Sequence, residues 1–247
     1  MADYVRYRPG YPPELVALLR DECGLGVEHL IADVGSGTGL LSRLFLENGN
    51  RVMGVEPNAE MRAAGEEFLA AYGGFSSVEG SSESTTLAGH SVDFVTVAQA
   101  FHWFEPLATH REFVRILKPG GWTVAVWNDR STGQSAFARG YEDLLMRYGT
   151  DYRKVKEAYP EARDLEEFFG RGNFLTRQLP NFQEFDFAGL AGRLRSSSYA
   201  PGEGHADYPA MMAALRNLFE ANQRSGRVRM EYRTEIHWGR LARRAGD

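Results

Sequence analysis

The sequence predicts an α/β protein with a doubly wound, mostly parallel sheet of seven strands, and two observations carry this prediction. Short apolar runs alternate with stretches of helical periodicity five times between residues 14 and 127, which is typical of parallel sheets flanked by helices. The first run leads into the glycine-rich turn Gly35-Ser36-Gly37-Thr38-Gly39. In such sheets this turn is where nucleotide-like ligands bind.

Five strands are expected in the first half of the chain, with one helix before the first strand and one after each of the first, second and fourth strands. The strands are predicted at residues 30–34, 51–56, 75–79, 92–98 and 122–127. Prolines at positions 13, 57 and 106 stand where helices are expected to begin. Lys118-Pro119-Gly120-Gly121 is expected to end the fourth of these helices.

The pattern changes after Asn128. Residues 131–178 are rich in aromatic residues at helical spacing and are predicted to form a helical cap insertion. A short sixth strand is expected near residues 182–187, and a helix around residues 208–219. Strict alternation of apolar and polar residues predicts a last strand over residues 228–238. Because the last strands return to the sheet, residues 1–247 are read as one domain.

Composition narrows the classes of partner. The chain has 247 residues, a net charge of −5 and one cysteine, Cys23. Without a basic block, no nucleic-acid partner is expected, and one cysteine builds neither a disulfide framework nor a cysteine metal site. No signal-peptide pattern or long apolar run is visible, so a cytoplasmic protein without a membrane or metal partner is expected. A monomer and a homodimer both remain open.

Two acids stand where a ligand is expected. Asp33 precedes the first glycine, and the spacing is G-x-G-x-G rather than the G-x-G-x-x-G of dinucleotide binders. A carboxylate at this point repels a pyrophosphate but suits a cationic, amine-bearing ligand. Glu56 ends the second strand, where an acid accepts hydrogen bonds from ribose hydroxyls. The alternative for Glu56 is a surface glutamate that favours a helix N-terminus.

Two segments that follow strands offer weaker candidates. Ser82 and Glu83 lie after the third strand and either contact an adenine edge or form an ordinary polar turn. The fourth strand runs into Phe101-His102-Trp103-Phe104. Because ligands bind at the carboxyl ends of such strands, these aromatics either line the active site or pack as core under the next helix. His102 is either catalytic or structural.

Several motifs together resemble the class I S-adenosylmethionine-dependent methyltransferases. More narrowly, the chain is similar to the type 11 methyltransferase group that includes trans-aconitate methyltransferase-like proteins. The resemblance covers nearly the whole chain. The motifs that carry it are Arg8-Pro9-Gly10-Tyr11-Pro12, the turn at 33–39, Glu56-Pro57-Asn58, residues 98–104, Leu117-Lys118-Pro119-Gly120-Gly121, and Leu194-Arg195-Ser196-Ser197-Ser198-Tyr199.

The resemblance implies S-adenosylmethionine as the cofactor and a sheet whose last strand is antiparallel. It implies that the glycine turn cradles the methionine part, that the Glu56-Pro57 end of the second strand holds the ribose, and that Met61 lies near the adenine. Backbone carbonyls would face the sulfonium and amino group, and an N-terminal segment would close over the carboxylate. The residues implied in these roles are Gly35, Ser36, Gly37, Gly39, Glu56, Pro57, Met61, Gln99, Ala100, Tyr4 and Arg8.

The expected reaction is methyl transfer to a small molecule, with a carboxylate or hydroxyl oxygen favoured. Phe101, His102, Trp103 and Trp127 are the candidate acceptor contacts, and His102 is the candidate base for a hydroxyl acceptor. No N/D-P-P-Y/F/W motif follows the fourth strand, which disfavours amino-methylation of adenine or glutamine. The alternatives are a cofactor-binding protein that does not methylate, such as a cyclase or binding module, and a nicotinamide-dependent oxidoreductase.

Overall fold

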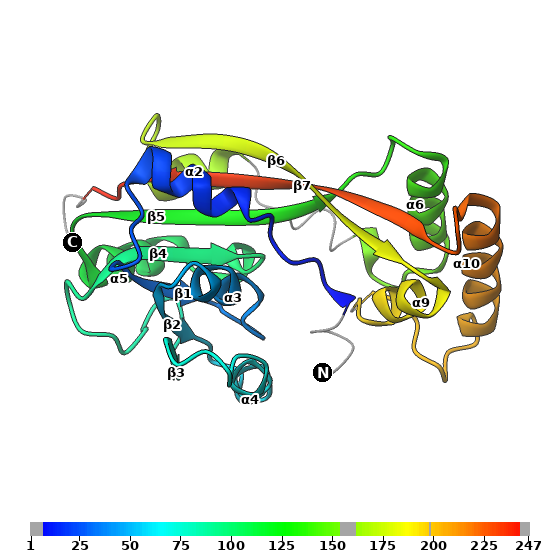
Figure 1. The fold of residues 1–247 in the computed structure, drawn as a ribbon, viewed down its shortest axis with the longest axis horizontal. Helices are drawn as coiled ribbons and strands as arrows, with labels where there is room; N and C mark the ends of the chain where they lie inside the picture. Colours follow the sequence, from blue (N-terminus) through cyan, green and yellow to red (C-terminus); the bar gives the residue numbers. More distant parts are fainter. Residues whose placement is uncertain (1–6, 154–161, 198, 243–247) are drawn as a thin grey trace. The chain divides into compact units, whose positions relative to one another are not determined.

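In the computed structural model, residues 7–153, 162–197 and 199–242 are described. Seven strands form one sheet in the order β3-β2-β1-β4-β5-β7-β6 (Figure 1). The strands are β1 (Leu30–Val34), β2 (Arg51–Val55), β3 (Phe75–Val78), β4 (Val92–Ala98), β5 (Leu117–Arg130), β6 (Phe174–Phe185) and β7 (Val228–Gly239). Strand order reverses beside β1, so the predicted doubly wound α/β fold is confirmed.

The first five strands are parallel, as the alternation of strands and helices predicts. Parallel pairing joins β1 to β2 and β4, β2 to β3, and β4 to β5. One register shift interrupts β5, because Val92 lies opposite Leu117 whereas Phe94 lies opposite Trp122. Residues 118–121 therefore form a bulge inside β5, which begins at Leu117 rather than at the expected residue 122.

The last strand runs against β6. The Thr176 hydroxyl lies 2.9 Å from His237 Nδ1, and Gln178 Nε2 donates to Glu235 Oε1 at 2.7 Å. Positions rise along β6 as they fall along β7, so the two strands are antiparallel.

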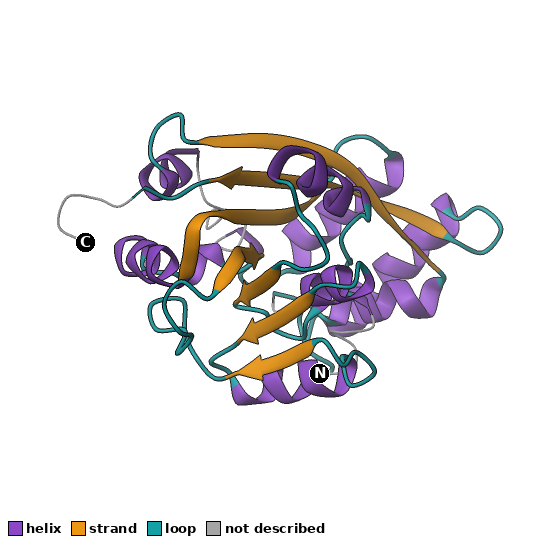
Figure 2. Ribbon diagram, turned by 60° about the vertical axis from the view of Figure 1, so that its left-hand side comes forward, coloured by secondary structure: helices purple, strands orange, loops and turns teal. Residues whose placement is uncertain are grey.

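Each helix begins or ends at a recognisable signal. The helices are α2 (Glu14–Cys23), α3 (Leu40–Glu47), α4 (Ala59–Phe68), α5 (Pro106–Ile116), α6 (Ala136–Tyr148), α8 (Ala162–Phe169), α9 (Phe187–Arg195) and α10 (Tyr208–Asn222), with a short 3₁₀ turn at Phe101–Trp103. Asn58, Glu105, Ser135 and Asp186 each accept backbone N–H groups at a helix start. Figure 2 shows these helices and the strands in separate colours.

The predicted sixth strand is present, but its predicted bounds, near 182–187, are wrong. Strand β6 begins earlier, at Phe174, and Phe187 is the first residue of α9. The side chain of Asp186 accepts the Gly189 N–H at 2.7 Å, and this N-cap starts a helix where aromatic alternation alone indicates a strand.

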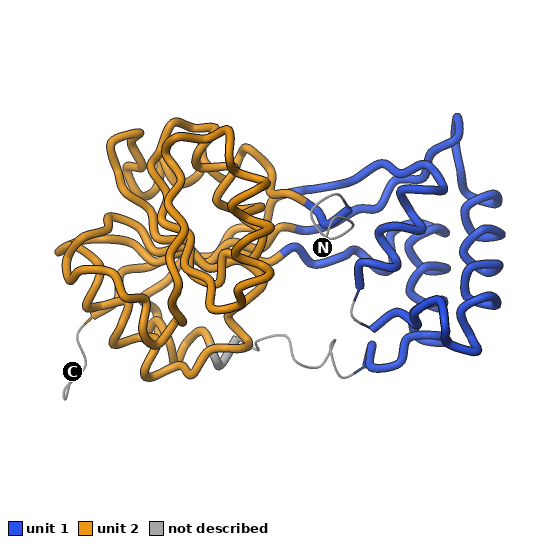
Figure 3. Tube along the Cα trace, turned by 90° about the horizontal axis from the view of Figure 1, so that it is seen from below, with its two compact units in different colours: residues 1–9, 128–159, 180–233 blue, residues 10–127, 160–179, 234–247 orange. Residues whose placement is uncertain are grey.

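The chain divides into two compact units (Figure 3). Unit 1 comprises 1–9, 128–159 and 180–233, and unit 2 comprises 10–127, 160–179 and 234–247. The expected cap at 131–178 falls in unit 1 only up to 159. The reading of the chain as one domain with a cap stays a prediction.

Unit 2 has one apolar core on each face of its strands, and unit 1 has a separate apolar core. Successive β1 residues Ile31 and Ala32 belong to different clusters, as the period of a strand requires. Helices α5 and α8 join one cluster, and α2 and α3 join the other. In unit 1, α6, α9 and α10 share a third cluster with β7.

In the described part of the chain, no helix is long and apolar enough to span a membrane.

Candidate functional site

The glycine turn after β1 has a backbone that other residues adopt only with strain. Gly35, Gly37 and Gly39 have φ values of 69°, 56° and 82°. A Cβ on Gly35 would lie 2.7 Å from the Ala100 Cβ. The turn is therefore pressed against the exit of β4, and glycine is required for this close approach.

Asp33 lies beneath the turn rather than open to solvent. Its side chain is 1% exposed and accepts hydrogen bonds from Ser42 Oγ at 2.6 Å and Thr96 Oγ1 at 2.9 Å. Burial raises the pKa of Asp33 to about 6, and the two hydroxyl hydrogen bonds partly oppose this rise. Asp33 thus joins β1, α3 and β4, and its expected contact with a cationic ligand stays a prediction.

Ser42 and Thr96 were not singled out from the sequence. Each is a hydroxyl residue in a mainly apolar run: Thr96 lies between Val95 and Val97, and Ser42 follows Leu40 and Leu41. A buried polar side chain needs a partner, so a hydroxyl in such a run was the signal available for a contact to Asp33.

Glu56 is brought directly to the turn. It is 8% exposed, its Oε2 accepts the Gly37 N–H at 2.9 Å, and its Oε1 accepts the Asn58 N–H at 2.9 Å. Each carboxylate oxygen keeps further lone pairs for a ligand hydroxyl. The geometry therefore fits an acid that both holds the turn and accepts hydrogen bonds from a ribose.

Met61 also borders the turn. The Asn58 side chain caps α4 by accepting the N–H groups of Glu60 and Met61, both at 3.0 Å. The Met61 Cε lies 3.3 Å from the position a Cβ on Gly37 would take. The thioether thus forms an apolar wall beside Gly37, and Pro57 lies exposed just before the helix.

Ser82 and Glu83 are linked to the loop after β4. The Ser82 hydroxyl donates to Glu83 Oε1 at 2.7 Å, and the same oxygen accepts the Glu105 N–H at 3.1 Å. Burial acts to raise the pKa of Glu83, but these hydrogen bonds outweigh it and the pKa is lowered. A charged Glu83 therefore ties the two loops together.

The exit of β4 carries an uncommon backbone conformation. Gln99 has φ of 56° although it is not a glycine, and such residues cluster at functional sites. Its N–H donates to Val126 O at 3.1 Å. Gln99 and Ala100 are both partly exposed, and Ala100 borders the glycine turn at Gly35.

The aromatic loop divides between core and surface. Phe101 is 4% exposed and packs edge-on against Phe168 at 4.8 Å, so it has the core role that the sequence left open. Trp103 is 80% exposed, and its ring lies 4.9 Å from the exposed His102 ring. Desolvation lowers the pKa of His102, so its imidazole is neutral at pH 7 and able to accept a proton.

Trp127 lies buried at 4% exposure near the end of β5. Among the described residues, no acceptor takes the hydrogen bond of its indole N–H. Its ring packs edge-on against His237 at 5.4 Å, and burial lowers the pKa of His237 to about 4. His237 is one of the polar residues that alternate along β7, yet it is 8% exposed because Phe174 and Trp127 pack against it.

Two expected cofactor contacts belong to the N-terminal segment. Tyr4 lies outside the described residues, and Arg8 belongs to unit 1, where its Nη2 donates to Ser196 O at 2.9 Å. Within the described ranges, no group of three His, Cys, Asp or Glu residues is arranged to hold a metal ion.

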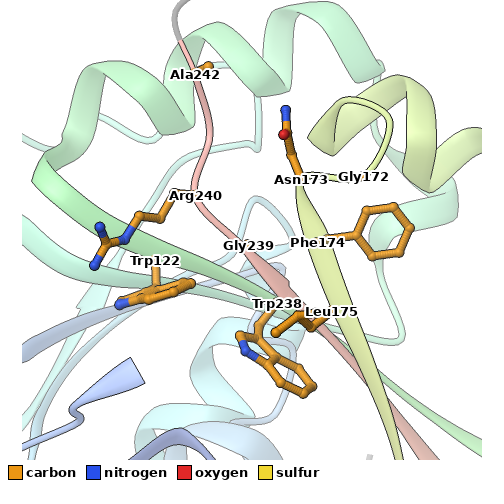
Figure 4. Close-up of a pocket in the computed structure, with 9 residues that line it drawn as sticks. All are labelled: Trp122, Gly172, Asn173, Phe174, Leu175, Trp238, Gly239, Arg240 and Ala242. Atoms are coloured by element: carbon orange, nitrogen blue, oxygen red, sulfur yellow. The ribbon is translucent and has the colours of Figure 1, made fainter. Parts of the chain in front are cut away.

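A recess of about 540 Å³ lies at the amino ends of the parallel strands, whereas the candidate site lies at their carboxyl ends. Figure 4 shows the residues that line this recess. The recess is lined by the beginnings of β5 and β6 and by the end of β7, and the Arg240 guanidinium lies 4.4 Å from the centre of the Trp122 ring. Ligands of doubly wound sheets bind at the carboxyl ends of the strands, so this recess is separate from the candidate site.

Comparisons with known proteins concern the domain family and the fold. Residues 32–125 match the family described as a methyltransferase domain. An uncharacterised methyltransferase of Mycobacterium tuberculosis H37Rv is 38% identical over 154 residues, covering 61% of this chain and 58% of the relative. An uncharacterised methyltransferase-like protein of Schizosaccharomyces pombe is 31% identical over 173 residues, covering 70% and 64%. The chain thus spans less than two thirds of these relatives.

Solved structures share the fold. A provisionally assigned type II methyltransferase of Anaeromyxobacter dehalogenans has a TM-score of 0.65 and 20% identity, covering 96% of this chain and all of the other. A phosphoethanolamine N-methyltransferase of Haemonchus contortus, solved with S-adenosylhomocysteine, has a TM-score of 0.54 and 14% identity, covering 95% and 54%. At these identities the likeness concerns the fold.

The match of residues 32–125, the relatives and the seven-stranded fold together support a class I S-adenosylmethionine-dependent methyltransferase. The comparisons do not extend to the trans-aconitate methyltransferase-like group.

Proposed function

We propose that the protein binds S-adenosylmethionine at the carboxyl end of its sheet and transfers the methyl group to an oxygen of a small molecule. One observation carries this proposal: Glu56 Oε2 accepts a hydrogen bond from the Gly37 N–H. This contact places an acceptor for ribose hydroxyls next to a glycine turn that allows a ligand to approach the backbone closely. The cofactor, when bound, supplies an electrophilic methyl group.

The chain's own residues would position the reactants. Gly35, Ser36, Gly37 and Gly39 bind the methionine part, with Asp33 fixing the turn from beneath. Glu56 orients the ribose, Met61 packs near the adenine, and Ser82 and Glu83 border it. The Gln99 and Ala100 carbonyls face the cationic end. Tyr4 and Arg8 remain proposed ligands of the carboxylate.

The acceptor is proposed to lie against His102, Trp103 and the Trp127 indole N–H. For a hydroxyl acceptor, His102 removes the proton, and its lowered pKa keeps it in the accepting form. For a carboxylate acceptor, no proton needs removal, and positioning with exclusion of water suffices. The protein is proposed to act in the cytoplasm.

Calorimetric titration with S-adenosylhomocysteine tests the cofactor site. Gly37→Val places a branched side chain beside Met61 in the turn, and binding is expected to fall below detection. Gly120→Val is the matched control, because Gly120 also has positive φ, at 81°, but has no atom within 4 Å of its Cβ position and lies in the β5 bulge. Unchanged binding in Gly37→Val would refute the site. Binding without transfer of labelled methyl to any small acid or alcohol would favour a non-methylating role.

A further inference from the structure

The interior of unit 1 contains a charged side chain that the proposed function does not use. Arg193 of α9 is 6% exposed, between the fully buried Leu190 and Leu194. Two positions further on, Arg195 is exposed. Helix α9 therefore directs one arginine into the interior and another toward solvent, as a period of 3.6 residues requires.

Arg193 has no ion pair with any described residue. Its Nη1 donates to Ser197 Oγ at 2.9 Å, and its Nε lies 3.4 Å from the Tyr232 hydroxyl. Both partners are neutral, and the second contact is long for a hydrogen bond. A buried cation is costly unless an anion and further hydrogen bonds compensate it. Arg193 therefore carries a buried positive charge without a matching carboxylate among the described residues.

Arg130, another arginine of unit 1, has a carboxylate partner that balances its positive charge. Its Nη2 lies 2.6 Å from Glu142 Oε2 and donates to the Tyr152 hydroxyl at 2.8 Å. Its guanidinium lies 4.9 Å from the centre of the Tyr141 ring. Glu142 is thus engaged by Arg130, and its charge matches Arg130 rather than Arg193.

Phenol groups complete the surroundings of Arg193. Tyr141, Tyr199 and Tyr232 each interact electrostatically with the guanidinium. Tyr141 and Tyr232 are 2% and 3% exposed, and burial raises the pKa of Tyr141, so it stays a neutral hydroxyl. Neutral phenols donate hydrogen bonds to anions, and their rings form apolar walls.

We propose that unit 1 binds a small-molecule carboxylate at Arg193. The planar guanidinium fork matches a carboxylate in geometry and charge. The Tyr141 hydroxyl supplies a further donor, whereas the Tyr232 hydroxyl already donates to Gln183 Oε1 at 2.9 Å. Aromatic rings and Met230 beside Tyr232 favour a carboxylate on an apolar body over a bare inorganic anion. This proposal concerns binding within unit 1 and does not depend on methyl transfer.

The test is calorimetric titration of the full chain with benzoate, succinate and inorganic phosphate at constant ionic strength. Benzoate or succinate is expected to bind saturably, and phosphate more weakly. Arg193→Met is expected to weaken carboxylate binding about 10- to 100-fold, since it removes hydrogen bonds to a charged group. Arg195→Met, on the exposed side of the same helix, is expected to change it less than about twofold.

The melting temperature measured without ligand shows whether Arg193 serves ligand binding or only stabilises the fold. Without ligand, Arg193→Met is expected to keep or raise the melting temperature, because an uncompensated buried charge is removed. If Arg193→Met does not fold, Arg193→Lys carries the test: it keeps the charge but loses the fork, and carboxylate affinity is expected to fall at least about tenfold.

Three results would overturn the proposal: no saturable carboxylate binding, undiminished binding in the Arg193 variants, or an equal loss in Arg195→Met. Failure here is distinguishable from failure of the methyltransferase proposal. Arg193→Met is expected to bind S-adenosylhomocysteine like the wild type, and Gly37→Val is expected to bind the carboxylate like the wild type.

Discussion

At the scale of single residues, Glu56 combines two tasks in one side chain. It accepts two backbone N–H groups of its own chain, from Gly37 and Asn58, and is proposed to accept ribose hydroxyls as well. A ligand that binds here meets an acceptor already fixed in place, so little side-chain entropy is lost on binding.

Glu56→Gln tests this role. The amide keeps one acceptor oxygen but loses the negative charge, and a hydrogen bond to a charged group contributes about 1.5–3 kcal/mol. Affinity for S-adenosylhomocysteine, measured by calorimetry, is expected to fall about 10- to 100-fold. Glu60→Gln, on the exposed first turn of α4, is the control and should bind normally. A change below twofold in Glu56→Gln would remove the ribose role.

His102 has a predicted pH signature. If the acceptor is a hydroxyl, the neutral imidazole is the active form, so the rate should rise with pH and reach a plateau. Because desolvation lowers the pKa of His102, this rise should be centred below its ordinary value of about 6.5. His102→Gln should lower turnover by about 100-fold and abolish the rise. Near-normal turnover with an unchanged pH profile would eliminate general-base catalysis.

Asp33 should make stability depend on pH. Its pKa of about 6 in the fold lies above the ordinary 3.8, so the native state holds its proton to higher pH than the unfolded chain. The stabilisation is full below pH 3.8 and is lost as pH rises through 6, by about 3 kcal/mol. Urea titrations at several pH values should show this loss in the wild type and not in Asp33→Asn.

Asp93 provides the contrast for that measurement. Burial alone would raise its pKa, but Lys118 and the Leu30 N–H lower it. Its stabilisation is therefore present above its ordinary pKa and is lost as pH falls. Asp93→Asn should remove stability at neutral pH and leave the loss between pH 4 and 6 intact; the same pH dependence in both variants would contradict the assignment to Asp33.

At the scale of elements, unit 1 depends on the packing of α10 against α6. Leu215 of α10 is fully buried and belongs to the same apolar cluster as Phe137 and Tyr141 of α6. Gly140 of α6 leaves room for Leu218 of α10, because a Cβ there would clash with that side chain. The two helices therefore approach closely along one face.

Leu215→Ala should destabilise this packing. Truncation of a fully buried leucine typically costs about 2–5 kcal/mol, because transfer energy is lost and a cavity remains. Chemical denaturation of the full chain should report this loss. Asn217→Ala, at an exposed position of the same helix, should stay within about 0.5 kcal/mol. Equal stability of the two variants would show that α10 is not anchored through Leu215.

At the scale of the whole molecule, the two proposed ligands should act on different units. Hydrogen exchange measured with S-adenosylhomocysteine should slow at residues 33–39, 54–61 and 98–104, which lie in unit 2. Exchange measured with benzoate should slow in α9 of unit 1. Protection by either ligand confined to the other unit would contradict its assigned site.

Local sequence patterns were enough to predict the sheet and its glycine turn. Periodicity placed β1, β2, β4 and β7 to within a few residues, because a strand buried on one or both faces must repeat its apolar residues. The sequence also indicated Gly35 and Glu56 as site residues. Glycine at position 35 is required by the positive φ of the turn, and glutamate at position 56 supplies a charged acceptor. These are local requirements, and local sequence therefore reveals them.

Which side chains contact one another could not be predicted from local sequence and follows from the tertiary structure. That Ser42 and Thr96 hold Asp33, that Phe101 packs inward while Trp103 stays exposed, and that His237 is covered by Phe174 and Trp127 all depend on contacts between segments far apart in the chain. The buried Arg193 is the clearest case. Its helical spacing with Leu190 and Leu194 allowed burial, but the absence of a matching carboxylate among the described residues follows only from how α9 packs against its neighbours.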